Sequence, residues 1–121
     1  MWVRDILREL PSISADSSLL EAVRLFDTHA SDQIIVLLDN EPAGILSAYE
    51  TLEKKLEGAS LMDIVVKDVM NRNILVIDAG VSVEEAAKTM LAHKYWMAVV
   101  TEDGEYKGVV TAGGLLKGLS T

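Results

Sequence analysis

The chain has 121 residues, of which 19 are acidic and 11 basic, so its formal charge near neutral pH is −8. This balance argues against binding to nucleic acid or to an anionic membrane surface, because both interactions depend on clustered Lys and Arg. The absence of cysteine excludes disulfides and thiolate chemistry.

Half of the residues are apolar, and we expect part of this apolar surface to face a partner chain. The longest unbroken apolar runs, 34–38 and 95–100, are far too short to span a bilayer. Charged residues interrupt the N-terminal region, where a secretory signal would need an apolar core. We therefore expect a cytoplasmic protein.

The predicted elements follow one another in the same order twice. The first half predicts a helical turn, a strand, a helix, two strands and a second helix, at 3–10, 12–14, 18–29, 33–38, 43–47 and 47–52. The second half predicts the same elements at 66–70, 74–77, 82–93, 96–101, 106–111 and 111–116. An order of strand, helix, strand, strand and helix is typical of an α+β unit whose sheet is covered by helices on one face.

Local signals support the boundaries of these elements. Ser18 and Ser82 are each followed three positions later by Glu, which is the capping-box signature of a helix start. The pairs Asp39-Asn40 and Asp103-Gly104 favour a tight hairpin between the two strands that flank each of them.

The two halves are copies of one repeat. A fixed offset maps 44–50 onto 108–114, and the same offset relates the two capping boxes. We therefore predict repeat 1 at 1–56, a connector at 57–65 and repeat 2 at 66–121. Because a domain of roughly 60 residues is marginally stable alone, we expect the copies to pack sheet to sheet about an approximate two-fold axis as one module.

Catalytic and metal sites have little support. The two histidines, His29 and His93, lie near predicted helix ends, where the helix dipole favours them without any chemical role. No zinc-ligand spacing is present, and the carboxylates fall at helix starts and turns. The sequence therefore predicts that the chain is not an enzyme and holds no metal.

The repeated junction motif carries a hydroxyl, Ser47 or Thr111, between a strand and a helix. Such a hydroxyl can cap the helix by accepting a hydrogen bond from the first turn. It can also contact a phosphate or ribose, because a helix N-terminus presents donors and a positive dipole to an anion. Both interpretations stay open, since the hydroxyl can serve them in turn.

The ordered motifs resemble those of a tandem pair of CBS domains, often called a Bateman module. The resemblance rests on the openings 3–7 and 66–70, the Ser-x-x-Glu-Ala helix starts, the strand 97–100, the Gly-hydrophobic-hydrophobic-Ser/Thr junctions and the leucine pair 115–116. These motifs run through almost the whole chain, and their order, repeated twice, is more specific than any one of them.

The resemblance implies two βαββα units with two clefts related by pseudo-symmetry, and a homodimer. It implies an adenosine-containing ligand in a cleft: AMP, ADP, ATP, S-adenosylmethionine or NADH. It further implies that no cofactor is required, and that the module regulates an attached or partner enzyme, channel or transporter without catalysis.

In nucleotide-binding relatives an Asp three positions after the junction hydroxyl holds the ribose hydroxyls. Here that position is Glu50 in one copy and Gly114 in the other, so neither copy keeps the Asp. Loss of such charge-assisted hydrogen bonds typically costs about 1.5–3 kcal/mol per bond. We therefore expect weak binding at best.

The resemblance implies that each cleft pairs one motif with strand ends of the other repeat. In the first-motif cleft, Ile45, Ser47 and Glu50 would face Ile77, Lys94 and Tyr95, with Lys94 on the phosphate and Tyr95 on the base. The alternative for 94–96 is a solvated lysine beside core aromatic residues.

The second-motif cleft is the weaker candidate. Val109 and Thr111 would face Ala15, Ser31 and Asp32, and Asp32 would repel phosphate. The leading hypothesis is thus a non-catalytic sensor of an adenosine derivative at the first motif. The alternative is a CBS pair that has lost ligand binding and serves for dimerisation or protein interaction.

Overall fold

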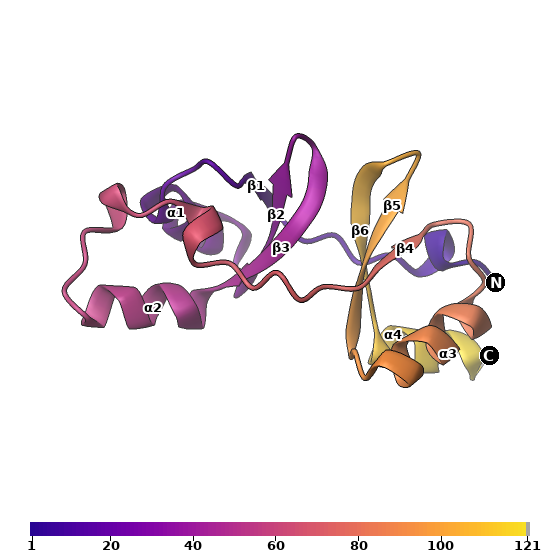
Figure 1. Cartoon of the computed structure of the whole chain (residues 1–121). Coiled ribbons are helices and arrows are strands. Elements are labelled where there is room, and N and C mark those ends of the chain that lie inside the picture. The colour runs from indigo at the N-terminus through magenta and orange to yellow at the C-terminus, as the bar shows by residue number, and fades with distance from the viewer. Residues whose placement is uncertain (121) are drawn as a thin grey trace. The chain divides into compact units, whose positions relative to one another are not determined.

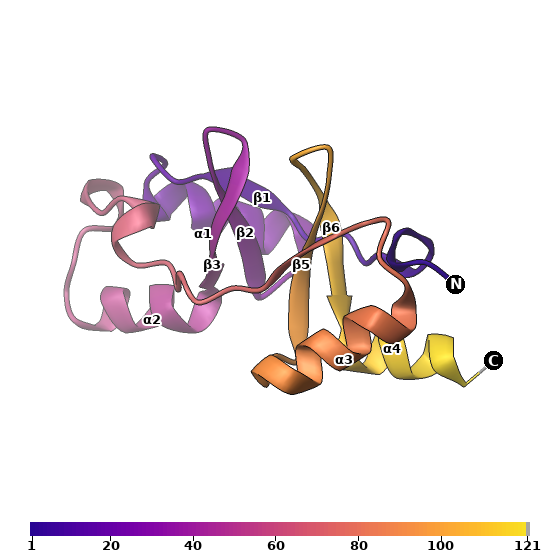
Figure 2. The same ribbon diagram turned by 45° about the vertical axis from the view of Figure 1, so that its right-hand side comes forward.

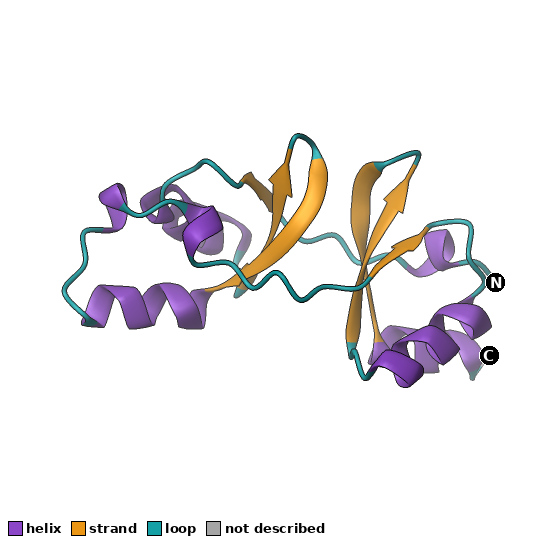
Figure 3. Ribbon diagram, viewed as in Figure 1, coloured by secondary structure: helices purple, strands orange, loops and turns teal. Residues whose placement is uncertain are grey.

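The structure is a computed structural model that describes residues 1–120. Figure 1 labels the α-helices and strands, and Figure 3 separates helices, strands and loops by colour. In chain order the elements are the short 3₁₀ helix η1 (Val3–Ile6), β1 (Ser12–Ser14), α1 (Leu19–His29), β2 (Gln33–Leu38), β3 (Glu41–Ser47), α2 (Ala48–Leu56), the 3₁₀ helices η2 (Leu61–Asp63) and η3 (Val66–Asp68), β4 (Val76–Asp78), α3 (Val83–His93), β5 (Met97–Glu102), β6 (Glu105–Thr111) and α4 (Ala112–Leu119).

The chain forms two compact units. The continuous unit consists of Leu10–Ile74, and the split unit combines Met1–Glu9 with Leu75–Thr121. Figure 2 shows the N-terminal residues beside β4–β6 rather than beside β1–β3, which follow them in the sequence. The sequence repeats and the compact units therefore divide the chain at different places.

Each unit contains one three-stranded mixed sheet. In the continuous unit the order is β1-β2-β3, with β1 parallel and β3 antiparallel to β2. The order β4-β5-β6 repeats this topology in the split unit. The two mixed sheets and four α-helices confirm the predicted α+β class with two βαββα units.

Both hairpins turn where the sequence predicts. Asp39 and Asn40 have φ values of 52° and 67°, and Asp103 and Gly104 have values of 53° and 81°. Two successive residues with positive φ are the signature of a type I′ turn, whose twist matches that of the strands. The turn, together with a one-residue register shift between Val36 and Leu37, sets the pairing of Gln33 with Ser47 at the far end of the hairpin.

The helices of each unit cover one face of its sheet. In the continuous unit, Ile34 and Val36 of β2 and Leu46 of β3 pack with Leu19 and Ala22 of α1, and all five are fully buried. Because successive strand residues point to opposite faces, Ile35 and its cross-strand partner lie on the other face. In the split unit the corresponding core residues are Val83, Ala86, Val100, Val110 and Leu115.

A hydroxyl side chain caps the N-terminus of each of the four α-helices. Ser18, Ser47, Ser82 and Thr111 each accept a hydrogen bond from the backbone N–H three positions on, at 3.0 to 3.2 Å. Each such bond satisfies one of the free donors of the first helical turn. The helix starts predicted from Ser18 and Ser82 are thus confirmed.

The segment at the start of each repeat pairs with the edge strand of one sheet. In the split unit the N-terminal strap (residues 1–9) donates from Val3 N to Val81 O at 2.9 Å and exchanges two hydrogen bonds between Arg8 and Val109. In the continuous unit the linking strap (residues 64–71) exchanges two hydrogen bonds between Asn71 and Ile45 in the same way. The strap valines Val3 and Val66 are fully buried in the respective cores.

Three predicted elements are shorter in the structure, and one of them is the helical turn predicted over 66–70, which ends at Asp68. The helical turn predicted over 3–10 ends at Ile6, because Leu7 is extended and Arg8 pairs with β6. The strand predicted over 74–77 begins at Val76, because residues 71–74 form a turn in which Ile74 N donates to Arg72 O at 3.0 Å.

Candidate functional site

A hollow of about 530 Å³ lies at the junction of β3 and α2. Its lining residues come from the start of β2, the end of β3 and the first two turns of α2: Asp32, Gln33, Ser47, Ala48, Tyr49 and Leu52. Hairpin register explains this assembly, because the antiparallel pairing of Gln33 with Ser47 brings the start of β2 beside the end of β3. The volume falls within the range of small-molecule sites.

Ser47 is held in two hydrogen bonds with Glu50. Its Oγ accepts from Glu50 N at 3.2 Å and donates to Glu50 Oε1 at 2.9 Å. The cap interpretation of Ser47 is therefore confirmed, although Glu50 closes onto the hydroxyl and not onto the backbone N–H that a capping box would use. A ligand that takes the Ser47 hydroxyl has to displace the Glu50 carboxylate from it.

Asp32 lies beside the N-terminus of α2. Its carbonyl oxygen accepts from Ala48 N at 2.9 Å, which fixes the residue beside the first turn of α2. The side chain is exposed, and among the described residues no hydrogen bond or ion pair holds its carboxylate. Within its own unit Asp32 lines the hollow at Ser47, and its predicted place opposite Thr111 in the other unit stays a prediction.

The second junction, at Thr111, has the same helix cap but lacks the side chains that surround Ser47. Thr111 Oγ1 accepts from Gly114 N at 3.0 Å, and α4 begins with Ala112, Gly113 and Gly114. No carboxylate or aromatic ring can therefore project from the first turn of this helix. Val109, the other residue predicted at this motif, is fully buried and pairs with Arg8.

The remaining predicted site residues are distributed over the two units. Ile45 is half-buried in the continuous unit, where its backbone pairs with Asn71. Ile77 is 9% exposed and packs into the core of the split unit. Lys94 is the exposed left-handed C-cap residue of α3, with a φ of 60°, and Tyr95 follows it half-buried.

Sequence reasoning missed most of the lining of the hollow. The sequence motifs do not indicate Gln33, Tyr49 or Leu52 as lining residues, and Tyr49 is 71% exposed. The signal that identifies them is the hairpin register: it pairs Gln33 with Ser47, and helical spacing then aligns Tyr49 and Leu52 along one face of α2.

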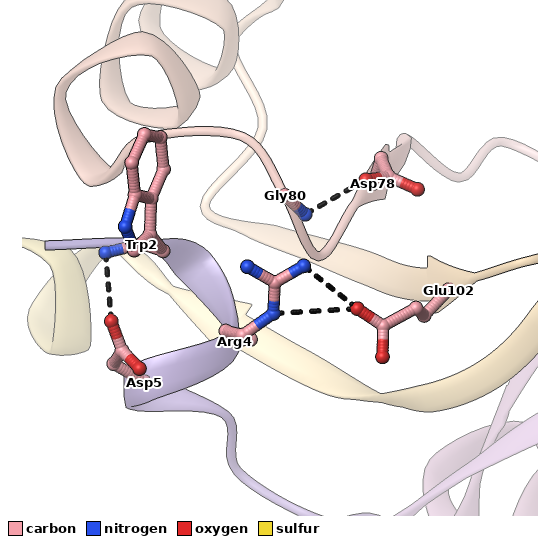
Figure 4. A network of polar contacts seen from close by, with 6 residues as sticks. All are labelled: Trp2, Arg4, Asp5, Asp78, Gly80 and Glu102. Atoms are coloured by element: carbon pink, nitrogen blue, oxygen red, sulfur yellow. Dashed lines mark hydrogen bonds and ion pairs between the residues drawn. The ribbon is translucent and has the colours of Figure 1, made fainter.

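The densest polar network of the split unit has a structural role. Figure 4 shows Arg4 donating from Nε and Nη2 to Oε2 of Glu102, at 3.3 and 2.8 Å. This hydrogen bond is the main cause that raises the pKa of the Arg4 guanidinium above its ordinary value. Trp2 N donates to Asp5 and Gly80 N to Asp78, so these groups fasten the N-terminal strap and its neighbouring turn.

Metal binding and membrane spanning find no support in residues 1–120. Within that range no three His, Cys, Asp or Glu side chains come together to hold a metal ion. None of the helices described there is long and apolar enough to cross a bilayer.

Comparison with known proteins agrees with the repeated architecture. A family profile for the CBS domain matches residues 3–57 and again residues 66–121. Inosine-5′-monophosphate dehydrogenase of Korarchaeum cryptofilum is 31% identical over 108 residues, which are 88% of this chain and 22% of that enzyme. The chain thus spans about a fifth of the length of this relative, and the rest of the enzyme has no counterpart in the aligned residues.

Solved structures share the fold. The CBS domain of a bacterial CNNM/CorC family Mg²⁺ transporter, in complex with ATP, is 17% identical with a TM-score of 0.81 and covers 99% of this chain and 87% of its own. CBSX2 in complex with AMP is 24% identical with a TM-score of 0.71 and covers 98% and 96%. Two family matches in tandem and a shared two-unit fold lead to one conclusion: the chain belongs to the CBS domain family and is a tandem pair of CBS domains.

Proposed function

We propose that this CBS pair is a non-catalytic regulatory module that binds an adenosine-containing ligand at the hollow beside Ser47. The observation that carries the proposal is the hollow itself, which combines a helix N-terminus, an aromatic ring and an apolar wall in about 530 Å³. The binding of ATP and AMP by structural relatives supports the ligand class.

The lining offers a separate contact for each part of a nucleoside. The ring of Tyr49 and the side chain of Leu52 provide apolar surface for a base. Ser47 and the first turn of α2 provide polar contacts for the sugar and its 5′ substituent. Thr111 lies at a helix start that offers neither ring nor carboxylate, so we propose the first motif as the preferred site.

Four residues stay predictions for this site on the strength of the family resemblance. Ile45 follows the motif glycine, while Ile77, Lys94 and Tyr95 belong to the split unit. Lys94 is exposed and Tyr95 is half-buried, whereas Ile77 packs in the core of the split unit. Among the three residues of the split unit, Lys94 is therefore the one whose substitution tests the predicted site.

Calorimetric titration with AMP, ADP, ATP, S-adenosylmethionine and NADH tests the proposal. We expect at least one of them to bind, and Ser47→Ala to weaken that binding roughly 10-fold, because a hydrogen bond of about 1.4 kcal/mol is lost. Thr111→Ala is expected to leave the affinity unchanged.

Ser18→Ala is the matched control for Ser47→Ala. Ser18 caps α1 of the same unit at the same distance of 3.2 Å, and it does not line the hollow. Both variants should lose about 1 kcal/mol of stability from the missing cap. Binding that is unchanged in Ser47→Ala, or equally weakened in Ser18→Ala, contradicts the site.

A second candidate function, self-association, is favoured by an apolar stripe on α2. The stripe consists of Tyr49, Leu52 and Leu56, which helical spacing places on one face and which are all exposed. Glu50 lies at the start of this helix and Lys54 and Lys55 near its end. Two copies that pack their stripes antiparallel therefore bring Glu50 of one copy near Lys55 of the other, since Lys54 is already paired with Glu57. We propose a second copy of this chain as the partner.

Sedimentation velocity tests this second candidate with one matched pair of variants. Leu56→Glu places a charge on the stripe and should dissociate a dimer, while Leu91→Glu on α3 should not. Leu56 and Leu91 are both 80% exposed, so the two changes differ in position and not in burial. A dimer that survives Leu56→Glu contradicts the stripe as its interface.

A further inference from the structure

α4 is intrinsically the weaker of the two helices that follow the repeated junction. Gly113, Gly114 and Gly118 make up three of its eight residues, whereas α2 contains no glycine. After proline, glycine is the least favourable residue in a helix. The order of α4 therefore depends on its packing against the rest of the split unit.

That packing is sparse. In the described helix Leu115 is the one buried side chain, while Leu116 and Leu119 are each more than half exposed. Elements with few buried apolar contacts open locally at a lower free energy than the fold as a whole. α4 thus has the properties of an element that opens while the rest of its unit stays folded.

Gly118 is the residue at which α4 contacts the N-terminal strap. A Cβ atom on Gly118 would lie 3.3 Å from Met1 Sδ and 3.9 Å from Ile6 Cγ2, and both of these neighbours belong to the strap. Val83 Cγ1 of α3 would lie 3.6 Å away. A Cβ atom on Gly113, by contrast, would have no neighbour closer than 4.0 Å. The small residue at 118 therefore lets the strap and the helix pack directly on each other.

The strap and α4 also share one core. Val3 of the strap and Leu115 of α4 belong to the same buried cluster. Met1 O accepts from Val83 N at 3.0 Å, which holds the start of the strap where Gly118 lies. Figures 1 and 2 both show the two segments side by side. Release of either segment therefore removes contacts that hold the other.

We infer that the N-terminal strap and α4, together called the latch (residues 1–9 and 112–119), release and dock as one element while β4–β6 and α3 stay folded. Because such coupling is reciprocal, whatever holds the strap also favours the docked helix, and whatever holds the helix favours the docked strap. A protein attached to or bound at either segment can thus shift the other between two states. The latch rests on the fold and does not depend on the ligand proposed above.

Native-state hydrogen exchange of the full chain at low urea concentrations tests this inference. The reporters are the amide of Val3, which donates to Val81 O at 2.9 Å, and the amides in the last turn of α4. The amide of Val99 in β5, which donates to Leu75 O at 2.8 Å, is the reference for the rest of the unit. We expect the latch amides to share one opening equilibrium. It should depend less on urea than that of Val99, because less surface is exposed.

Gly113→Ala stabilises the helix of the latch. It should slow the exchange of the latch amides, in the strap as well as in α4, by roughly 3- to 5-fold, which reflects the preference for alanine over glycine in a helix. Slower exchange in α4 beside an unchanged Val3 amide would show that the strap opens by itself, and would overturn the inference.

Ala92→Gly on α3 is the matched control, because it makes the reverse change at an exposed position of a helix outside the latch. Since α3 stays folded when the latch is open, this variant should accelerate the exchange of Val99 by roughly 2- to 5-fold and leave the latch amides unchanged. Equal acceleration of Val99 and the latch amides would show that they open only when the whole unit unfolds, which contradicts the latch.

Discussion

Gly44 and Gly108 open the repeated junction motif, and in both units a strap crosses directly over their α-carbons. A Cβ atom on Gly44 would lie 2.7 Å from the carbonyl oxygen of Asn71, and one on Gly108 would lie 2.9 Å from that of Arg8. Both neighbours are backbone atoms that pair with the following residue of the motif. The glycine is therefore required by the strap, and the ligand contact that we propose for the motif begins only at Ser47.

We predict that Gly44→Ala lowers the free energy of unfolding by roughly 1–3 kcal/mol, because the added methyl has to move a hydrogen-bonded backbone. Urea denaturation followed by circular dichroism measures this change.

Gly113→Ala is the control for the same substitution in an open position. The nearest atom to its Cβ would be Thr111 Oγ1 at 4.0 Å, and the equivalent position of α2 already carries Tyr49. Since alanine favours a helix over glycine by up to about 1 kcal/mol, this variant should be as stable as the original chain or more so. Equal destabilisation in both variants would exclude the close approach of the strap as the cause.

At the scale of the elements, the straps explain why the compact units differ from the sequence repeats. Each contributes one fully buried valine, Val3 or Val66, to a core built by other elements. Arg4 adds an ion pair to Glu102, but both side chains are substantially exposed, so this pair contributes little. Burial of the valine and the backbone pairing are therefore the main ties between strap and sheet.

We predict that Val3→Ala destabilises the split unit and Val66→Ala the continuous unit, each by roughly 1.5–3 kcal/mol for the loss of buried methyl groups. Hydrogen exchange resolves the two effects. Val3→Ala should accelerate exchange in α3 and β5, and Val66→Ala should do so in α1 and β2. Faster exchange in α1 after Val3→Ala would contradict the assignment of the N-terminal strap.

Local sequence patterns predict most of the helices and strands, but they do not predict which sheet each strap joins. Ser18 and Ser82 mark their helix starts, and β2 runs over the six predicted residues, because capping and strand patterns act between near neighbours. Nothing near Val3 in the sequence indicates that its partner is Val81. The residues of the candidate site divide in the same way: Ser47 and Glu50 belong to a local motif, whereas Asp32 lies beside Ser47 only through the register of the hairpin.

For the whole molecule, the formal charge of −8 opposes the approach of a second copy. The opposite charges at the two ends of α2 are exposed, and exposed ion pairs contribute only about 0–1 kcal/mol. Net repulsion should therefore outweigh the local pairs in any dependence of self-association on salt.

We predict that raising the salt concentration from 0.01 to 0.15 M tightens the dimer, because the Debye length falls from about 30 Å to about 8 Å. Sedimentation equilibrium at a series of salt concentrations gives the dissociation constants, and Leu91→Glu serves again as a folded reference. Weaker association at higher salt would show that the ion pairs beside the stripe dominate.

The split unit also dictates an order of events during synthesis. Residues 10–74 contain every element of the continuous unit, so this unit can fold as soon as they leave the ribosome. The N-terminal strap is made before residues 10–74, whereas its partners Val81 and Val109 are made after them. Val3 therefore remains without its core while the continuous unit is translated, and closure of such a long loop is slow. The nascent chain exposes this apolar segment until β6 is complete.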